Sequence, residues 1–201
     1  MSVTLPPEPP AFVETDVAAR LGAIVDRATT AAKALRDLDQ GAVDEIVHAM
    51  VVAGVRHAVE LAELAMEETG FGVFEDKVIK NYVATEFLYD HLRDKRTVGV
   101  IEEDRERALS YVAEPIGVVL ALLPITNPTS TALFKAIVAA KTRNAVVFRP
   151  SARAARCAAR AEGRKMTALR VLAATIALNS AVEVGLVIGS SASTTPIGSA
   201  T

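Results

Sequence analysis

The sequence predicts an α/β protein in which N-terminal helices are followed by a partial parallel sheet. Three stretches before residue 94 carry apolar residues at helical spacing, with polar residues between them. An unbroken apolar run, Ile116–Leu123, has the pattern of a strand that is covered on both faces in a parallel sheet. A helical segment and a second apolar strand follow with short connections, which predicts one right-handed βαβ unit.

The first helix follows a proline-rich arm, residues 1–13, whose rings favour an extended chain. Thr15 or Asp16 is the expected N-cap. The apolar stripe of this helix comprises Val17, Leu21, Ile24, Val25, Ala28, Ala32 and Leu35.

Two more amphipathic helices are expected before the sheet. One runs from Ala42 to Glu68 and ends at Gly70, because glycine is the common residue after a helix. The other runs from Phe74 to Arg93. Four charged residues near its start are expected to form a solvated face with pairs at spacing four: Glu75, Asp76, Lys77 and Lys80.

The sheet region begins after Asp104. Residues 108–113 alternate loosely and predict a strand, and residues 116–123 predict a buried strand. Residues 124–127 form a turn, and Asn127-Pro128 is a strong helix start because Asn can cap and Pro suits the first position. The expected helix spans 128–141, and after a turn residues 145–148 form the second buried strand.

The C-terminal part has a different composition from the rest. No aromatic residue follows Phe148, and residues 151–201 carry six basic and two acidic residues, whereas residues 1–150 have a net charge of −6. The first 150 residues therefore have the composition of a folded core, and the last 40 or so do not.

Several function classes are excluded by composition. A net charge of −2 does not favour a nucleic-acid partner, and no apolar run reaches the roughly 20 residues of a membrane helix. We expect no secretory signal, because residues 1–5 have neither a basic nor an apolar region, and a single cysteine, Cys157, excludes an internal disulfide and a cysteine-rich metal site. We therefore expect a cytoplasmic protein without a metal, a membrane or a nucleic acid.

Candidate site residues follow the two buried strands. Ligands bind beyond the carboxyl ends of parallel strands, where residues 124–127 and 149–151 should lie side by side. The Asn127 amide could donate to an oxyanion, or it could merely cap the next helix. Arg149 could hold a phosphate or a ribose hydroxyl, or it could be a solvated arginine.

Five segments of the sequence carry a resemblance to a known family: residues 73–81, 95–101, 113–119, 126–135 and 141–148. Together they resemble the aldehyde dehydrogenase superfamily, and in particular its CoA-acylating branch, which includes acetaldehyde dehydrogenases and the N-terminal half of bifunctional aldehyde-alcohol dehydrogenases. The resemblance runs in order from about residue 14 to about residue 160 and fades beyond it. It implies an arm (1–13), a partial NAD-binding domain (14–160) and a divergent, weakly structured tail (161–201), which suggests a fragment, a split gene product or a frameshifted end.

The resemblance implies a partial Rossmann-like NAD-binding domain and a thiol-based mechanism. In such enzymes a cysteine attacks a small aldehyde, a hydride passes to NAD, and CoA takes the acyl group. Asn127 matches the oxyanion asparagine of the family, and Pro124, Ile125 and Thr126 match the segment beside the nicotinamide. Arg149 and Ser151 stand where many non-acylating relatives have a Lys-Pro-Ser that contacts the adenosine ribose, so Arg149 departs from the acylating pattern.

One further departure concerns the nucleophile. The catalytic cysteine of the family lies in a domain far downstream of the asparagine, whereas Cys157 follows Asn127 by only 30 positions. We therefore expect Cys157 to be a packing residue and the isolated chain to be inactive in oxidising an acetaldehyde-like substrate. The alternative is a non-catalytic nucleotide-binding or interaction module. A sheet of two or three strands also leaves an apolar edge, which favours homo-oligomers or other association.

Overall fold

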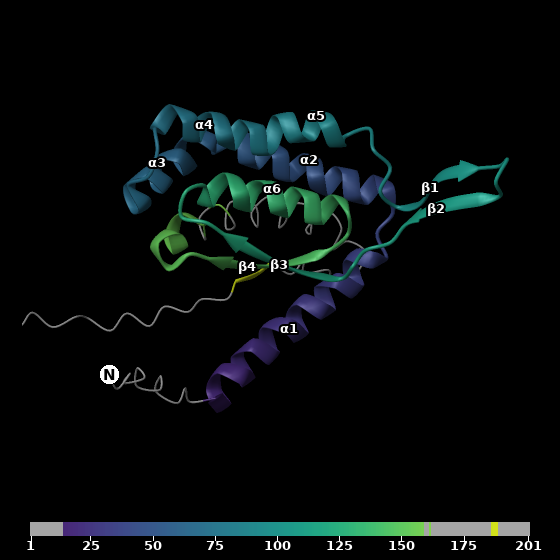
Figure 1. Ribbon diagram of the computed structural model, residues 1–201, viewed down its shortest axis with the longest axis horizontal. Helices are drawn as coiled ribbons and strands as arrows, with labels where there is room; N and C mark the ends of the chain where they lie inside the picture. The colour runs from purple at the N-terminus through teal and green to yellow at the C-terminus, as the bar shows by residue number, and fades with distance from the viewer. Residues whose placement is uncertain (1–13, 159–160, 162–185, 189–201) are drawn as a thin grey trace, which may run out of the picture.

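The computed structural model describes residues 14–158, 161 and 186–188 (Figure 1). The N-terminal helices are α1 (Glu14–Arg36), α2 (Gln40–Arg56), α3 (Ala58–Thr69), α4 (Phe74–Tyr82), the π-helical turn η1 (Val83–Phe87) and α5 (Leu88–Leu92). They are followed by β1 (Gly99–Asp104), β2 (Leu109–Ala113), β3 (Val118–Leu123), α6 (Pro128–Lys141), β4 (Ala145–Pro150), the 3-10 turn η2 (Ala152–Ala154) and β5 (Leu186–Ile188).

The central sheet is parallel, with the strand order β3-β4-β5. Strand β3 pairs with β4 from Val118 opposite Ala145 to Leu123 opposite Pro150, and α6 connects the two strands. The predicted α/β fold and its βαβ unit are therefore confirmed, and α6 has the predicted bounds. Strand β5 lies within the segment that we expected to be weakly structured. The rest of that segment and the proline-rich arm lie outside the described residues.

Helix α6 lies between the sheet and an outer layer formed by α2, α4, η1 and α5, as Figure 1 shows. Its sequence is apolar on nearly all sides because it packs against both layers. Phe148 of β4 and Leu133 and Ile137 of α6 are fully buried together with Ile46 and Val47 of α2. Burying one such side chain contributes about 1.5–3 kcal/mol, so this contact fixes α6 and the ends of β3 and β4.

Both predicted helices between residues 42 and 93 are interrupted. The helix expected from Ala42 to Glu68 is divided at His57, whose φ of −107° and ψ of 12° leave the helical region. The helix expected from Phe74 to Arg93 contains the π-helical turn η1, where Thr85 packs against Gly54 of α2. A Cβ at Gly54 would lie 2.6 Å from Thr85 Cγ2, so only glycine permits this approach.

A two-stranded antiparallel hairpin, β1–β2, projects from one end of the molecule (Figure 1). The strand predicted over residues 108–113 is its second strand, and its first strand was not predicted. Three acidic residues, Glu102, Glu103 and Asp104, obscure the alternation of β1, and a bulge between Val100 and Glu102 shifts its register.

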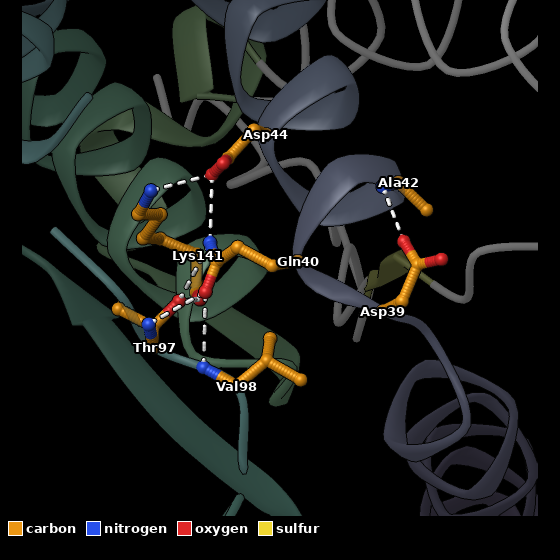
Figure 2. Close-up of polar contacts among 7 residues, drawn as sticks. All are labelled: Asp39, Gln40, Ala42, Asp44, Thr97, Val98 and Lys141. Atoms are coloured by element: carbon orange, nitrogen blue, oxygen red, sulfur yellow. Dashed lines mark hydrogen bonds and ion pairs between the residues drawn. The ribbon is translucent and has the colours of Figure 1, made fainter. Parts of the chain in front are cut away.

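A polar network joins the base of this hairpin to α2 and α6 (Figure 2). The Lys141 ammonium is buried and lies 2.5 Å from Asp44 Oδ1. Gln40 Oε1 accepts the backbone N–H groups of Thr97 and Val98, and Thr97 Oγ1 donates to the Lys141 carbonyl oxygen. Residues 97–98, which lead into β1, are therefore held to the helical layers.

Helix α1 covers the other face of the sheet only with its C-terminal half. Ala28, Ala31 and Leu35 are buried, whereas Val17 and Leu21 are exposed. In Figure 1 the N-terminal half of α1 extends away from the sheet. The expectation that β3 is covered on both faces is therefore wrong for the described part of the chain. Leu120 and Leu122 are exposed because none of the described residues covers them.

Candidate functional site

The two segments predicted to follow the strands lie side by side at the carboxyl end of the sheet, but Arg149 and Pro150 belong to β4, which is two residues longer than predicted. The register brings Leu123, the last residue of β3, opposite Pro150 of β4. The backbone N–H of Ser151 donates to the Leu123 carbonyl oxygen at 3.0 Å. Residues 124–127 and 149–151 thus share one edge, where ligands of open parallel sheets bind.

Asn127 is the residue before α6, but its side chain does not cap this helix. Its φ of −141° and ψ of 57° lie outside the helical region, and the amide accepts no N–H of the first turn. The Asn127 Oδ1 atom is buried and has no hydrogen-bond partner among the described residues. Capping is therefore excluded for this geometry, and the amide is not used in holding α6.

Asn127 instead lines a cavity of about 570 Å³ that opens widely to solvent between α6 and the layer of α4, η1 and α5. Most of the wall is apolar, and the polar groups are few. The residues of the wall are Lys80, Val83, Ala84, Phe87, Leu88, Asn127, Ser130, Thr131 and Phe134. An apolar cavity with a few polar groups is the usual form of a small-molecule site.

On the helical wall of this cavity polar side chains are buried and apolar side chains are exposed, which is the reverse of the usual pattern. Three polar residues at spacing four, Lys77, Asn81 and Thr85, are buried. Apolar residues at the same spacing are exposed, and two of them, Val83 and Phe87, line the cavity. A helix that needed only to pack would bury the apolar stripe, so this inversion indicates a surface kept apolar for a ligand or for another part of a protein.

Lys77 overturns the expectation of a solvated charged face. Its side chain is 5% exposed, and its ammonium donates to the Thr126 carbonyl oxygen at 2.9 Å. Burial lowers the pKa of Lys77, and the nearby Lys80 ammonium lowers it further. Asn81 Oδ1 accepts a hydrogen bond from Thr129 Oγ1, so α4 contacts the backbone before Asn127 and the first turn after it.

The other predicted site residues differ in exposure. Pro124 and Thr126 are exposed, and Ile125 is half-buried against a cluster that contains Ala65, Ala154 and Cys157. Arg149 is exposed, and its Nη1 donates to the Pro150 carbonyl oxygen at 2.6 Å. Ser151 is half-buried. The structure brings these residues to one edge, where Arg149 binds the backbone of its own neighbour.

Cys157 is a buried packing residue, as expected from the sequence. Its side chain is 1% exposed, and its Sγ lies 3.5 Å from the Ala154 carbonyl oxygen. Burial raises the pKa of the Cys157 thiol to about 12, and the Glu68 carboxylate contributes to the rise. Because the thiolate is the nucleophilic form, Cys157 is unsuited to attack an aldehyde near neutral pH.

Glu68, which binds the backbone of Cys157, has a structural role. Its two carboxylate oxygens accept the backbone N–H groups of Arg156 and Cys157, at 2.9 and 2.6 Å. These bonds lower the pKa of Glu68 although burial, the largest single influence, acts in the opposite direction. Glu68 therefore fastens residues 156–157 to α3.

Two other classes of site are not found in the described part of the chain. No group of three or more His, Cys, Asp or Glu side chains is arranged to hold a metal ion there. Within the same residues, none of the helices has the length and apolarity that crossing a bilayer requires.

The model of the aldehyde dehydrogenase family matches residues 9–162, and the chain belongs to this family. The bifunctional aldehyde-alcohol dehydrogenase AdhE of Escherichia coli K12 is 43% identical over 136 residues, which are 68% of this chain and 15% of that protein. The chain thus spans about a sixth of the length of this curated relative.

Solved structures of acylating aldehyde dehydrogenases are also similar to the chain. An acetylating aldehyde dehydrogenase from Geobacillus thermoglucosidasius is 39% identical, with a TM-score of 0.74, over 80% of this chain and 36% of that one. A propionaldehyde dehydrogenase from Rhodopseudomonas palustris, solved with bound CoA and an acylated cysteine, is 26% identical, with a TM-score of 0.57, over 76% of this chain and 34% of that one. The relatives are thus CoA-acylating aldehyde dehydrogenases, and the resemblance deduced from the sequence is confirmed.

Proposed function

We propose that this chain forms part of a cytoplasmic, NAD-dependent, CoA-acylating aldehyde dehydrogenase that oxidises a short, acetaldehyde-like substrate. In the overall reaction, the aldehyde, CoA and NAD⁺ give the acyl-CoA, NADH and a proton. The observation that carries the proposal is Asn127, which follows the carboxyl end of β3, caps nothing and lines an apolar cavity between α6 and the outer helical layer.

The role that we propose for Asn127 follows from its side-chain amide Nδ2, which is free to donate a hydrogen bond. The Nδ2 group makes no hydrogen bond to any described residue, and Oδ1 is buried without a partner. An aldehyde in the cavity would place its oxygen, which becomes negative when a thiol attacks the carbonyl carbon, against this donor. One donor of this kind stabilises a transition state by about 2.7–4 kcal/mol.

The edge residues fit a dinucleotide in position and in exposure. Pro124 and Thr126 are exposed beyond the end of β3, and Arg149 is exposed within β4, one residue before its end, at the edge where cofactors of such sheets lie. When bound, NAD would accept the hydride that leaves the aldehyde carbon. The turn at 124–126 would lie against its nicotinamide half, and Arg149 and Ser151 are the candidate contacts for its ribose.

The attacking thiol must come from outside this sequence. Its single cysteine is Cys157, which is buried and protonated near neutral pH. We therefore propose that the isolated chain does not reduce NAD with acetaldehyde and CoA. Turnover by the isolated chain that disappears in Cys157→Ser would overturn this part of the proposal.

A non-catalytic module is the second candidate, and the exposed apolar surface favours it. Leu120 and Leu122 on β3 are 64% and 61% exposed, and Ile116 is 87% exposed. Apolar groups of this extent mark interaction surfaces. We propose that the chain associates through this edge, either with copies of itself or with the part of an enzyme that supplies the thiol.

A chimeric enzyme separates the two candidates. Residues 14–158 would replace the matching segment of the E. coli relative, and NADH formation would be followed with acetaldehyde and CoA. We expect turnover in the chimera and none in the isolated chain. A folded chimera without turnover would contradict the catalytic proposal and favour the module.

A further inference from the structure

The two most deeply buried lysines of the described chain have different partners. Lys141 is 1% exposed, and its ammonium is paired with the Asp44 carboxylate. Lys77 is 5% exposed, and its only partner among the described residues is a neutral one, the Thr126 carbonyl oxygen. Burying an ammonium without an opposite charge is costly, so a lysine in this position requires a compensating role.

The partner of Lys77 immediately precedes Asn127. On the other side of Asn127, Thr129 Oγ1 donates to Asn81 Oδ1 at 3.0 Å, and Asn81 Nδ2 donates to the Ala58 carbonyl oxygen at 2.8 Å. Lys77 and Asn81 lie one turn apart on α4. The backbone of Asn127 is therefore held from both sides by α4, while its own side chain is left out of these contacts.

The loop after α3 covers the ammonium. Gly72 has a φ of +87°, and a Cβ there would lie 3.6 Å from Lys77 Cε and 3.7 Å from Lys77 Nζ. This backbone lies close against the end of the lysine side chain. The Lys77 ammonium is therefore shielded from water on this side, although Thr126 is exposed, and this burial strengthens its bond to the Thr126 carbonyl oxygen.

We propose that Lys77 is a positioning residue for Asn127: its ammonium holds the Thr126 carbonyl and so fixes the turn from which the Asn127 amide faces the cavity. The inference rests on the proposed function for its catalytic meaning, but the positioning itself is a property of this chain. Lys77 acts through the backbone and does not touch the aldehyde.

Hydrogen exchange of the full chain, resolved by residue, tests the proposal. The reporter is the backbone N–H of Thr131, which donates to the Asn127 carbonyl oxygen at 3.1 Å. The variant Lys77→Met keeps an unbranched side chain but loses the hydrogen-bond donor. We expect exchange at Thr131 to be about tenfold faster in this variant while circular dichroism is unchanged. Exchange at Thr131 equal to that of the unmodified chain would overturn the proposal.

Lys135→Met is the matched control. Lys135 Nζ also donates to a backbone carbonyl, that of Leu122 at 2.7 Å, but this bond joins α6 to β3 and not α4 to the turn. We expect no change at Thr131 in this variant. An equal acceleration in both variants would show a general loss of stability and would overturn the specific role of Lys77.

A measurement on the unmodified chain covers the case in which Lys77→Met does not fold. The ¹³C signal of the Thr126 carbonyl should move with the deprotonation of Lys77, which occurs below the ordinary pKa of 10.5. Burial and Lys80 on the same helix lower this pKa, and Cys157 raises it. A Thr126 signal that does not follow Lys77 would overturn the proposal.

Titration of the same samples with NAD separates this inference from the proposed function. If the Lys77 effects are found and NAD does not bind, the positioning stands and the dinucleotide site fails. If NAD binds and the Lys77 effects are missing, the positioning alone is overturned.

Discussion

The backbone N–H of Ser151 donates to the carbonyl oxygen of Leu123, 3.0 Å away, and this bond joins the loop after β4 to the end of β3. It extends the parallel register by one step beyond the pair of Leu123 and Pro150. The edge that carries Asn127 is consequently formed by the described residues themselves, even though they include only three strands of the sheet.

Removal of the Asn127 side chain should leave stability almost unchanged. The amide makes no capping bond, so we expect Asn127→Ala to change the free energy of unfolding by less than about 0.5 kcal/mol. Asp39→Ala is the matched control, because Asp39 Oδ1 accepts the N–H of Ala42 at 2.8 Å and truly caps α2. Its loss should cost about 1 kcal/mol. Urea unfolding measures both, and equal costs would contradict the geometry described for Asn127.

Cys157 should resist alkylation in the folded chain. Its burial and its pKa of about 12 keep the thiol protonated at pH 8, so we expect iodoacetamide to label it only after unfolding. The same shift predicts a pH dependence. Because the folded pKa of the Cys157 thiol is above the ordinary value of 9.0, the contribution of the neutral thiol to stability is complete below pH 9 and declines as the pH rises toward 12. Rapid labelling of the native protein, followed by mass spectrometry, would contradict this placement.

The ion pair of Asp44 and Lys141 should respond unequally to removal of its two partners. The Lys141 side chain is 2% exposed and that of Asp44 is 41% exposed. In Asp44→Ala a buried ammonium loses its carboxylate, and we expect a loss of about 1–3 kcal/mol in the free energy of unfolding. Lys141→Met should cost less, since water can solvate the remaining carboxylate. Urea unfolding measures both losses. A larger loss in Lys141→Met than in Asp44→Ala would contradict this prediction.

The exposed apolar residues of β3 should cause concentration-dependent association. We expect the elution volume in gel filtration to decrease as the protein concentration rises, and Leu122→Lys to suppress this change. Leu21→Lys is the control, because Leu21 is comparably exposed on α1, at 57% against 61%. A sharp monomer peak of the unmodified chain at high concentration would exclude association.

Local patterns predicted much of the sheet region. The apolar runs of β3 and β4 and the Asn-Pro start of α6 are strong signals that depend little on tertiary context, and the bounds of α6 agree with the structure. The position of Asn127 at the ligand edge follows from the same signals, because topology alone puts the ends of parallel strands together.

Features that depend on packing between distant segments were not predicted. The π-helical turn in the third predicted helix accompanies the close contact between Thr85 and Gly54, which are 31 positions apart. Lys77 was assigned to solvent because charged residues usually are, and only the spacing of Lys77, Asn81 and Thr85 could have indicated a buried polar row. The hairpin strand β1 was missed because its acidic residues concealed a strand that is exposed on both faces.

The turnover of Asn127→Ala in the chimeric enzyme tests the central claim most directly. The variant removes one oxyanion donor without removing a cap, so kcat should fall by about 10²–10³-fold with little change in KM. Asp39→Ala, which removes the cap of α2 and alters no residue of the cavity wall, should keep kcat within about threefold of the unmodified chimera. An Asn127→Ala chimera that retains full kcat would contradict the assignment of this amide to the reacting carbonyl.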